Sequence, residues 1–383
     1  MKRKSCIVCG AKLNSQSVFR CKNMPATSQD LPTSEQLDND RTVDFELCQC
    51  SGCGLVQFNN EPVSYYRDST RAGERCDVLI KLRQQQYKHF IETYHLQGKK
   101  LVEIGAGKGG FLKTLKDLTE YDMKEYGIEY NSEFVKYARE EFGVNVQQGN
   151  PENEDTLIDG APFDAFTSFA YPARLIHPNS MMQCIYNNTT EKAIGLIMVP
   201  SMEHLLNPGG YYDITADHIA YYDASTLRFM VQRNGFEVIE QGEVADMYIY
   251  AIMRKRPVYD LATAWSDIDL FTKDIESFIA GEKRADRKIA IWCAGHFAFT
   301  VLAMTNIAND IEYIIDNAEF KKGKYSPGSH VLIEGPEYYT QHPVDTIMIL
   351  GPIYVKEIIN EIHEKCSQTI KIVTVDKLGL HDV

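Results

Sequence analysis

Residues 101–111 read Leu101-Val-Glu-Ile-Gly105-Ala-Gly107-Lys-Gly109-Gly110-Phe111, and this stretch decides the fold of the central part of the chain. Residues 100–104 are mostly apolar, as in a buried strand, and residues 111–118 have the apolar spacing of a helix. Glycines between a strand and a helix allow the backbone to approach a bound ligand closely. The stretch therefore predicts a strand, a ligand-binding turn and a helix.

The carboxylates around this turn discriminate between ligands. Read as G-x-G-x-x-G, Gly105, Gly107 and Gly110 are typical of a dinucleotide site, with the pyrophosphate at the helix N-terminus. Glu103 precedes the first glycine, and its charge would repel a phosphate but attract a cationic or amine-bearing ligand. Glu129 ends the next expected strand and can accept hydrogen bonds from both ribose hydroxyls. We therefore expect S-adenosylmethionine rather than NAD, with contacts from Glu103, Gly105, Gly107, Gly109 and Glu129.

Asn150 is a further candidate for a cofactor contact. It follows the third expected strand in Gln-Gln-Gly-Asn150, where an asparagine can hydrogen-bond the edge of an adenine. A lone asparagine after a strand is also typical of a turn. Both interpretations of Asn150 stay open at this point.

The alternation of strands and helices predicts an α/β protein with parallel sheets covered by helices. The expected strands of the central part are residues 100–104, 125–129, 144–148, 163–168 and 193–199, followed by an antiparallel pair at 236–239 and 248–253. A helix at 81–94 leads into them, and a helix at 261–279 leads to a second alternation that begins at residue 288. At 383 residues the chain exceeds the usual ~100–200 residues per domain. We expect a small N-terminal zinc-binding lobe (1–64), a class I, Rossmann-like methyltransferase domain (65–256) and a second Rossmann-like domain (257–383).

Six of the ten cysteines fall within the first 53 residues. Cys6-x-x-Cys9 and Cys50-x-x-Cys53 are each followed by glycine, which permits the tight turn of a zinc knuckle. Four thiolates around one zinc ion form a closed tetrahedral site with no open position for substrate, so we expect a structural Zn²⁺. Cys21 stays unassigned, and Cys48 competes as a ligand because a strand would place it on the same face as Cys50.

Composition and charge exclude several classes of function. Forty Lys and Arg against 53 Asp and Glu give a net charge of −13, which disfavours nucleic acid as the main partner. The most apolar later stretch, residues 289–304, is too short to span a bilayer, and no apolar stretch follows the basic start. Clustered cysteines that bind metal are typical of a reducing compartment. We expect a cytoplasmic protein that acts on a small molecule.

Three stretches together resemble one known family, the sugar C-methyltransferases that act on nucleotide-linked keto-deoxysugars. They are the zinc knuckles ending in Cys53-Gly-Leu-Val-Gln57, the glycine turn, and Asp217-His218-Ile-Ala-Tyr-Tyr222-Asp-Ala-Ser-Thr-Leu227. In the C-terminal part, residues 316–330 are similar to the family's D-x-x-x-x-K-x-G-K-Y-x-P-G-x-H stretch. The resemblance covers nearly the whole chain in the same domain order.

The resemblance implies a mechanism in which a histidine removes the proton beside a ketone and the enolate takes the methyl group of the cofactor. It assigns the base to His218, and Asp217 stands where the family has a glutamate. An imidazole can take a proton near neutral pH without being permanently charged. His204 and His177 are other histidines near the same strand ends. The candidates for catalysis are His218, Asp217 and Tyr222.

Thr215 departs from the family pattern, which usually has a tyrosine three residues before the histidine. Tyr211, Tyr212, Tyr221 or Tyr222 can substitute for it. The departure leaves open a related sugar or an O-methyl acceptor. Two other functions stay open: an O- or N-methyltransferase with another acceptor, and a non-catalytic protein that binds a sugar nucleotide or a partner and retains the cofactor as a structural element.

The C-terminal domain begins like a second dinucleotide fold, but Cys293 stands where the first glycine of the fingerprint would fall. In the family this domain helps to form the cleft for the nucleotide sugar. The resemblance therefore implies that Gly295, His296, Lys321, Lys322, Lys324, Tyr325 and His330 are candidates for substrate contact. A solvated loop is an equally good explanation of the lysines.

Overall fold

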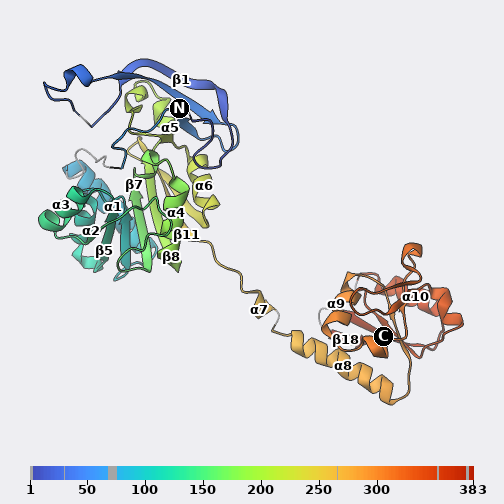
Figure 1. Cartoon of the computed structure of the whole chain (residues 1–383). Helices are drawn as coiled ribbons and strands as arrows, with labels where there is room; N and C mark the ends of the chain where they lie inside the picture. The colour runs from blue at the N-terminus through green and yellow to red at the C-terminus, as the bar shows by residue number, and fades with distance from the viewer. Residues whose placement is uncertain (1–2, 30, 68–75, 265, 352, 377–378) are drawn as a thin grey trace. The chain divides into compact units, whose positions relative to one another are not determined.

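The computed structural model describes residues 3–29, 31–67, 76–264, 266–351, 353–376 and 379–383. The chain divides into two compact units, residues 1–258 and 259–383 (Figure 1). The cysteine-rich lobe lies in the first unit together with the central domain, and the division into three domains stays a prediction. In the described residues, no helix is long and apolar enough to cross a membrane.

The lobe contains an antiparallel sheet of four strands, and the fourth strand comes from the central part of the chain. Its order is β1 (Leu13–Pro25), β2 (Thr42–Cys50), β3 (Val56–Phe58) and β9 (Ala220–Tyr221). In the pairing of β3 with β9, Val56 lies opposite Tyr221. Phe45, Phe58 and Tyr221 are buried together between the lobe and the central domain. The lobe is therefore fixed to the segment that precedes β9.

The central sheet is a doubly wound α/β sheet with the strand order β10-β11-β8-β7-β4-β5-β6. The neighbours from β8 to β6 pair in parallel, and β11 pairs antiparallel with both β8 and β10. The strands are β4 (Lys100–Ile104), β5 (Lys124–Glu129), β6 (Val146–Gln148), β7 (Phe163–Phe169), β8 (Thr189–Pro200), β10 (Phe236–Val244) and β11 (Tyr248–Lys255). The expected strands are thus present, although β6 begins later and β8 is longer at both ends than expected.

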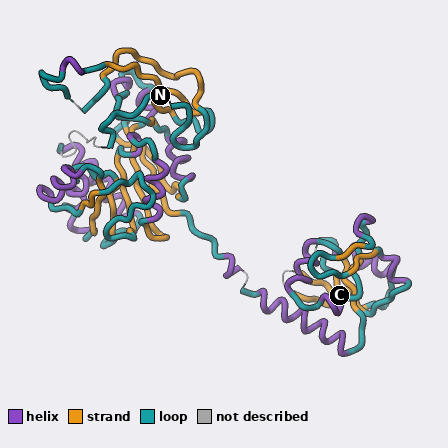
Figure 2. Tube along the Cα trace, viewed as in Figure 1, coloured by secondary structure: helices purple, strands orange, loops and turns teal. Residues whose placement is uncertain are grey.

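Alternation along the strands distributes apolar side chains to both faces of this sheet. Leu101 packs toward α1 and α2, whereas Val102 and Ile104 pack toward α4 and α6. Figures 1 and 2 show these helices on opposite sides of the sheet. The helices are α1 (Asp77–Thr93), α2 (Gly110–Lys116), α3 (Ser132–Phe142), α4 (Pro178–Asn187), α5 (Met202–Leu205) and α6 (Ala224–Arg233).

The strand order reverses direction at β4, because β5 lies on one side of it and β7 on the other. In open α/β sheets, ligands bind beyond the carboxyl ends of the strands at such a switch point. The glycine turn after β4 lies at this edge.

The C-terminal unit has a sheet of the same kind, with the order β14-β15-β13-β12-β16-β17-β18. Its strands are β12 (Ile289–Trp292), β13 (Ile314–Ile315), β14 (Lys324–Tyr325), β15 (Leu332–Glu334), β16 (Thr346–Ile349), β17 (Lys371–Asp376) and β18 (Gly379–Asp382). Its helices are α7 (Leu261–Ala264), α8 (Ile268–Arg284), α9 (His296–Met304) and α10 (Val355–Lys365). The continuous helix expected at 261–279 is wrong, because α8 begins anew after Asp267 and runs on to Arg284.

Candidate active site and cysteine cluster

The glycine turn adopts a backbone that other residues rarely adopt. Gly105, Gly107 and Gly109 have φ angles of 72°, 57° and 78°, a region that favours glycine. A Cβ on Gly105 would lie 2.4 Å from the ring of Tyr171, which follows β7. A Cβ on Gly109 would lie 2.9 Å from Ala138 in α3. The glycines thus permit both the tight turn and its close packing against β7 and α3.

Two carboxylates belong to this edge of the sheet. Glu129 Oε2 accepts a hydrogen bond from Gly107 N at 2.8 Å, and Glu129 Oε1 accepts one from Asn131 N at 3.0 Å. A carboxylate has about four lone-pair sites, so Glu129 can hold the turn and still accept ligand hydroxyls. Glu103 is fully buried in β4, on the same face of the strand as Leu101.

A cavity of about 480 Å³ opens beside Glu129 at the carboxyl ends of β5 and β6. Asn150 lines it, and its Oδ1 accepts a hydrogen bond from Glu152 N at 3.1 Å. The side-chain oxygen of Asn150 therefore stabilises a turn, as the second interpretation of this residue requires. The lining residues are Tyr130, Asn131, Ser132, Glu133, Gln148, Gly149 and Asn150.

Glu152 is a buried carboxylate next to this cavity that the sequence did not single out. It accepts hydrogen bonds from Tyr66 Oη at 3.1 Å, Arg67 Nε at 2.8 Å and His177 N at 3.0 Å. Burial, and after it the charges of Glu129 and Glu152, raise the pKa of the Tyr171 phenol well above its usual value. Tyr66 and Arg67 thus join the segment that ends at residue 67 to Glu152, near the carboxyl end of β6.

His218 lies in the segment between residue 213 and β9, where it lines a small cavity of about 50 Å³. Its Nδ1 is buried and has no hydrogen-bond partner among the residues that the structure describes. Burial, and after it the Arg174 guanidinium, lower the pKa of the imidazole to about 3. His218 is therefore neutral near pH 7, as a proton acceptor must be. The lining residues are Pro200, Ser201, His204, Leu205, Asp213, His218, Tyr221, Met247 and Tyr248.

His204 lines the same cavity but is held on both sides of its ring. Its Nδ1 lies 2.9 Å from the carbonyl oxygen of Asp246, and its Nε2 lies 3.0 Å from Asp213 Oδ2. A carbonyl oxygen only accepts hydrogen bonds, so Nδ1 must carry a proton. This arrangement suits His204 less well than His218 to the role of a base.

Asp217 contacts Tyr65 and Arg174, which lie on other segments of the chain. It is almost fully buried, accepts a hydrogen bond from Tyr65 Oη at 2.7 Å, and has its Oδ2 4.0 Å from Arg174 Nη1. Tyr65 Oη in turn accepts a hydrogen bond from Ser28 N at 2.7 Å. Asp217 therefore joins the segment of His218 to the lobe.

Tyr221 and Tyr222 point to opposite faces because they are neighbours at a strand. The Tyr221 ring lies edge-on to His218, with the centroids 6.2 Å apart. Tyr222 is fully buried in a core that includes Cys6 and Cys50, and burial followed by the charges of Cys6 and Cys53 raises the pKa of its phenol. The structure thus brings Tyr221, and not Tyr222, to the cavity of His218.

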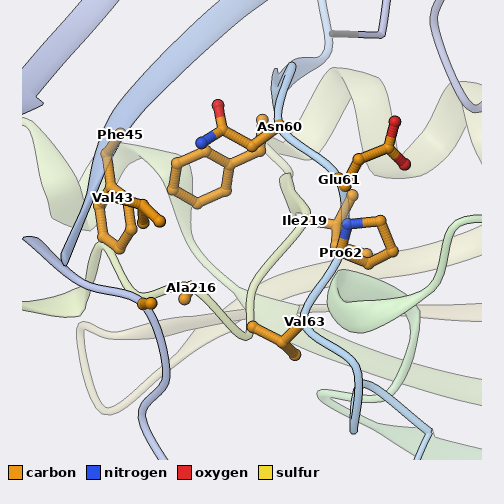
Figure 3. Close-up of a pocket in the computed structure, with 10 residues that line it drawn as sticks. Val43, Phe45, Asn60, Glu61, Pro62, Val63, Ala216 and Ile219 are labelled. Carbon is orange, nitrogen blue, oxygen red and sulfur yellow. The ribbon is translucent and has the colours of Figure 1, made fainter. Parts of the chain in front are cut away.

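A second cavity, of about 260 Å³, lies on the lobe side of the same segment. Val43 and Phe45 of β2 face Pro62, Val63 and Ile219 across it (Figure 3). Glu61 is its charged lining residue, so the cavity suits an uncharged group better than a diphosphate. The lining residues are Ala26, Val43, Phe45, Phe58, Asn60, Glu61, Pro62, Val63, Ala216 and Ile219.

The described residues contain a cysteine cluster with the geometry of a metal site. The Sγ atoms of Cys6, Cys9, Cys50 and Cys53 lie within 4.8 Å of one another. In each knuckle, backbone amides point to a sulfur: Val8 N lies 3.4 Å from Cys6 Sγ, and Gly52 N lies 3.3 Å from Cys50 Sγ. Four cysteines in this arrangement could bind zinc.

The two additional cysteines of the lobe lie outside this cluster. Cys48 is buried and receives a weak hydrogen bond from Asn59 Nδ2, with the nitrogen 3.5 Å from the sulfur. Cys21 Sγ lies 3.9 Å from the carbonyl oxygen of Lys22. Alternation along the strand puts Cys48 and Cys50 on the same face, so it cannot tell which of them belongs to the cluster. The turn that follows Cys50 directs Cys50 to the cluster.

Two family models match the chain. The first, described as a methyltransferase domain, matches residues 79–241, and the second, described as a C-methyltransferase C-terminal domain, matches residues 259–375. No curated protein matches closely enough to be named as a relative.

Solved structures of methyltransferases are similar to the central domain. A S-adenosylmethionine-dependent methyltransferase from Clostridium acetobutylicum has 12% identity over 48% of this chain and 94% of its own, with a TM-score of 0.39. A SAM-dependent methyltransferase from Aquifex aeolicus has 16% identity over 46% and 92%, with a TM-score of 0.37. The glycopeptide N-methyltransferase MtfA complexed with sinefungin has 12% identity over 45% and 85%, with a TM-score of 0.37.

The strand order of the central sheet, with its glycine turn at the switch point, is that of an α/β fold of the Rossmann type. The match of residues 79–241 to a methyltransferase domain indicates that this fold transfers methyl groups. The match of residues 259–375 supports a C-methyltransferase family. The chain therefore carries a methyltransferase domain followed by a C-methyltransferase C-terminal domain.

Proposed function

We propose that the protein methylates a carbon atom of a nucleotide-linked keto-deoxysugar. The observation that carries the proposal is His218, a neutral imidazole whose Nδ1 has no hydrogen-bond partner among the described residues. The match of residues 259–375 to a C-methyltransferase C-terminal domain supports transfer to carbon. The sugar class comes from the sequence resemblance around Asp217 and His218.

In this mechanism His218 takes the proton from the carbon beside the ketone of the acceptor. The electron pair of the C–H bond moves onto the ketone oxygen, which gives an enolate and an imidazolium. S-adenosylmethionine supplies the electrophilic methyl group that the enolate carbon takes up. Asp217 acts as a positioning residue, because its bonds to Tyr65 and Arg174 fix the backbone next to His218.

The cofactor residues fit the proposed ligand. Glu129 would accept hydrogen bonds from the ribose hydroxyls, and Asn150 lines the cavity that would hold the adenine. Glu103 would attract the amino group of the methionine part. The glycine turn after β4, with Gly105, Gly107 and Gly109, would let the backbone approach the cofactor.

We expect Gly105→Ala to weaken binding of S-adenosylhomocysteine and to destabilise the protein. Positive φ alone costs about 1–2 kcal/mol for a residue with a Cβ, and here the Cβ would also meet the Tyr171 ring at 2.4 Å. Gly98→Ala is the matched control, because Gly98 has a φ of 71° and open space around it. Thermal unfolding and calorimetric titration provide the measurements. Equal losses of stability in both variants, with unchanged binding, would contradict this role of Gly105.

The zinc proposal assigns Cys6, Cys9, Cys50 and Cys53 to one structural Zn²⁺. A closed site of four thiolates leaves no position for substrate, so the ion would stabilise the lobe and take no part in methyl transfer. Such a staple suits a lobe whose long loop, from residue 26 to β2, contributes few apolar side chains.

Tyr221 is our candidate for the tyrosine that Thr215 replaces. Its hydroxyl lies 3.3 Å from Thr215 N and 3.4 Å from Thr215 O, at the backbone of the residue where the family has tyrosine. The Tyr221 hydroxyl therefore lies near position 215, where it can take the role that the family's tyrosine has at that position. The acceptor would meet this hydroxyl next to His218.

In the C-terminal unit, the lysines named from the sequence differ in their contacts. Lys321 Nζ lies 2.7 Å from Asp316 Oδ2, and Lys322 Nζ lies 2.7 Å from Glu337 Oε1. Lys324 and Tyr325 are exposed. Among these three lysines we propose Lys324, rather than the two that form ion pairs, as the residue of this unit available to an anionic ligand.

Hydrogen exchange separates methylation of carbon from methylation of oxygen or nitrogen. In heavy water, with S-adenosylhomocysteine in place of the methyl donor, we expect the enzyme to exchange the proton beside the ketone of a thymidine-diphosphate-linked keto-deoxyglucose. The readout is the loss of that proton signal by NMR. Thymidine-, uridine- and guanosine-linked sugars form the panel. Methyl transfer without exchange on any of them would instead favour the second candidate, an O- or N-methyltransferase, which the departure at Thr215 leaves open.

A further inference from the structure

Arg174 ends a short turn (Pro172–Arg174) that follows β7. Ile219 N donates a hydrogen bond of 2.8 Å to the carbonyl oxygen of Ala173, so this turn is tied to the segment that carries His218. The side chain of Arg174 is 13% exposed. The Arg174 side chain is therefore mostly buried.

The surroundings of Arg174 show where its charge acts. Its Nη1 lies 4.0 Å from Asp217 Oδ2, and its charge is second only to burial in lowering the pKa of His218. Tyr171 precedes the turn, and its ring packs on Gly105 of the cofactor turn. Arg174 thus contacts Asp217, the sequence neighbour of the proposed base, and its turn follows Tyr171, which packs on the glycine turn.

We propose that Arg174 contacts the ketone oxygen of the acceptor and stabilises the enolate that forms when His218 removes the proton. This inference rests on the proposed function and adds a residue that neither the sequence nor the family matches assign. The proton moves from the acceptor carbon to the imidazole, and the electron pair moves onto the oxygen that faces the guanidinium.

Electrostatics explain why the site needs a cation. A neutral histidine with a depressed pKa is a weak base, so the carbon acid must be made stronger for the proton to transfer. A fixed positive charge beside the developing oxyanion does this, and it acts strongly where water is excluded. The same charge disfavours the imidazolium, and Asp217 next to Arg174 reduces that penalty.

Arg174→Met removes the charge and keeps the length of the side chain, and Arg174→Lys keeps the charge. We expect Arg174→Met to slow the exchange of the acceptor proton by about 10²-fold or more, and Arg174→Lys to retain part of the rate. Binding of S-adenosylhomocysteine should stay near the wild-type value in both variants. Arg228→Met is the matched control, because Arg228 lies on α6 and donates to Gln241 at the surface.

A second readout does not depend on turnover. The imidazole of His218, assigned by NMR with His218→Asn, should titrate at higher pH in Arg174→Met, and in Arg174→Lys as in the wild type. The other titratable groups around it are unchanged in these variants, namely His204, Asp213, Asp217, Tyr221 and Tyr248. Arg174→Met combined with Asp217→Asn additionally removes the carboxylate that would otherwise lose its ion pair with Arg174, while an amide oxygen remains to accept the hydrogen bond from Tyr65.

The outcomes are distinguishable. Slow exchange in Arg174→Met and in the double variant, but not in Arg228→Met, together with the shifted titration in Arg174→Met, supports the inference. Exchange at the wild-type rate in Arg174→Met overturns it and leaves the proposed function intact. Absence of exchange in the wild-type enzyme, with methyl transfer to oxygen or nitrogen, overturns both.

Discussion

Replacing His218 by asparagine is expected to lower kcat by about 10²–10⁴-fold, because the variant lacks the group that takes the proton from the acceptor. Asparagine fills a similar space and keeps a polar group in the cavity, but it cannot accept a proton near pH 7. Binding of S-adenosylhomocysteine should be unchanged, since the residues that we propose for the cofactor are located at the glycine turn and at the ends of β5 and β6. Steady-state kinetics and calorimetric titration measure both quantities.

Two further histidines make this prediction specific. His89→Asn should leave turnover unchanged, because His89 lies on α1 and contacts Glu240 away from the site. His204→Asn tests the other histidine of the same cavity, whose nitrogens face Asp246 and Asp213. If His218→Asn kept near wild-type turnover, the assignment of the base would be wrong, and loss of turnover in His204→Asn would transfer the role to His204.

Removal of the proposed zinc ion is expected to have the largest effect on structure. Structural zinc sites of this kind contribute apparent free energies of about 10–16 kcal/mol at pH 7. Without the ion, Cys9 Sγ and Cys50 Sγ, 3.3 Å apart, would lose the charge that holds them together. Because β3 pairs with β9, loss of the lobe would also displace the segment of His218. We therefore expect chelation, or Cys50→Ser, to abolish methyl transfer as well as to unfold the lobe.

Hydrogen exchange by mass spectrometry on the full chain locates this effect. Peptides from β1 and β2 should lose protection, and peptides from β12 to β17 in the other compact unit should keep it. Cys21→Ser and Cys48→Ser are matched controls that should retain one zinc per chain, because both residues lie outside the cluster. Freshly purified protein without zinc, with a protected lobe, would contradict the structural role of the metal.

The parts of the fold that the sequence predicted are those in which local pattern and tertiary structure agree. The strand at residues 100–104 is present with the expected bounds, because its apolar run is bounded by a glycine turn. The four-cysteine cluster follows from two short spacings, each of which fixes its own turn. The prediction of one continuous helix at 261–279 was wrong, because the spacing of apolar residues does not show where a helix is interrupted, here between α7 and α8.

Residues of the site that the sequence missed act through contacts between distant positions. Tyr65 and Asp217 are 152 positions apart, and no local motif connects them. Glu152 meets Tyr66 and Arg67 in the same way. The orientation of Tyr221 and Tyr222 did have a signal, because neighbouring residues of a strand face opposite sides. A choice between the two tyrosines still required the side of the strand on which His218 lies.

Transfer of an isotope-labelled methyl group tests the central claim most directly. The enzyme is incubated with methyl-labelled S-adenosylmethionine and with each member of the panel of nucleotide-linked keto-deoxysugars, and NMR of the product identifies the atom that carries the label. The account predicts a methyl group bonded to the carbon beside the ketone, and its absence from the product of the His218→Asn variant. A label on oxygen or nitrogen, or a carbon-methylated product formed at full rate without His218, would contradict it.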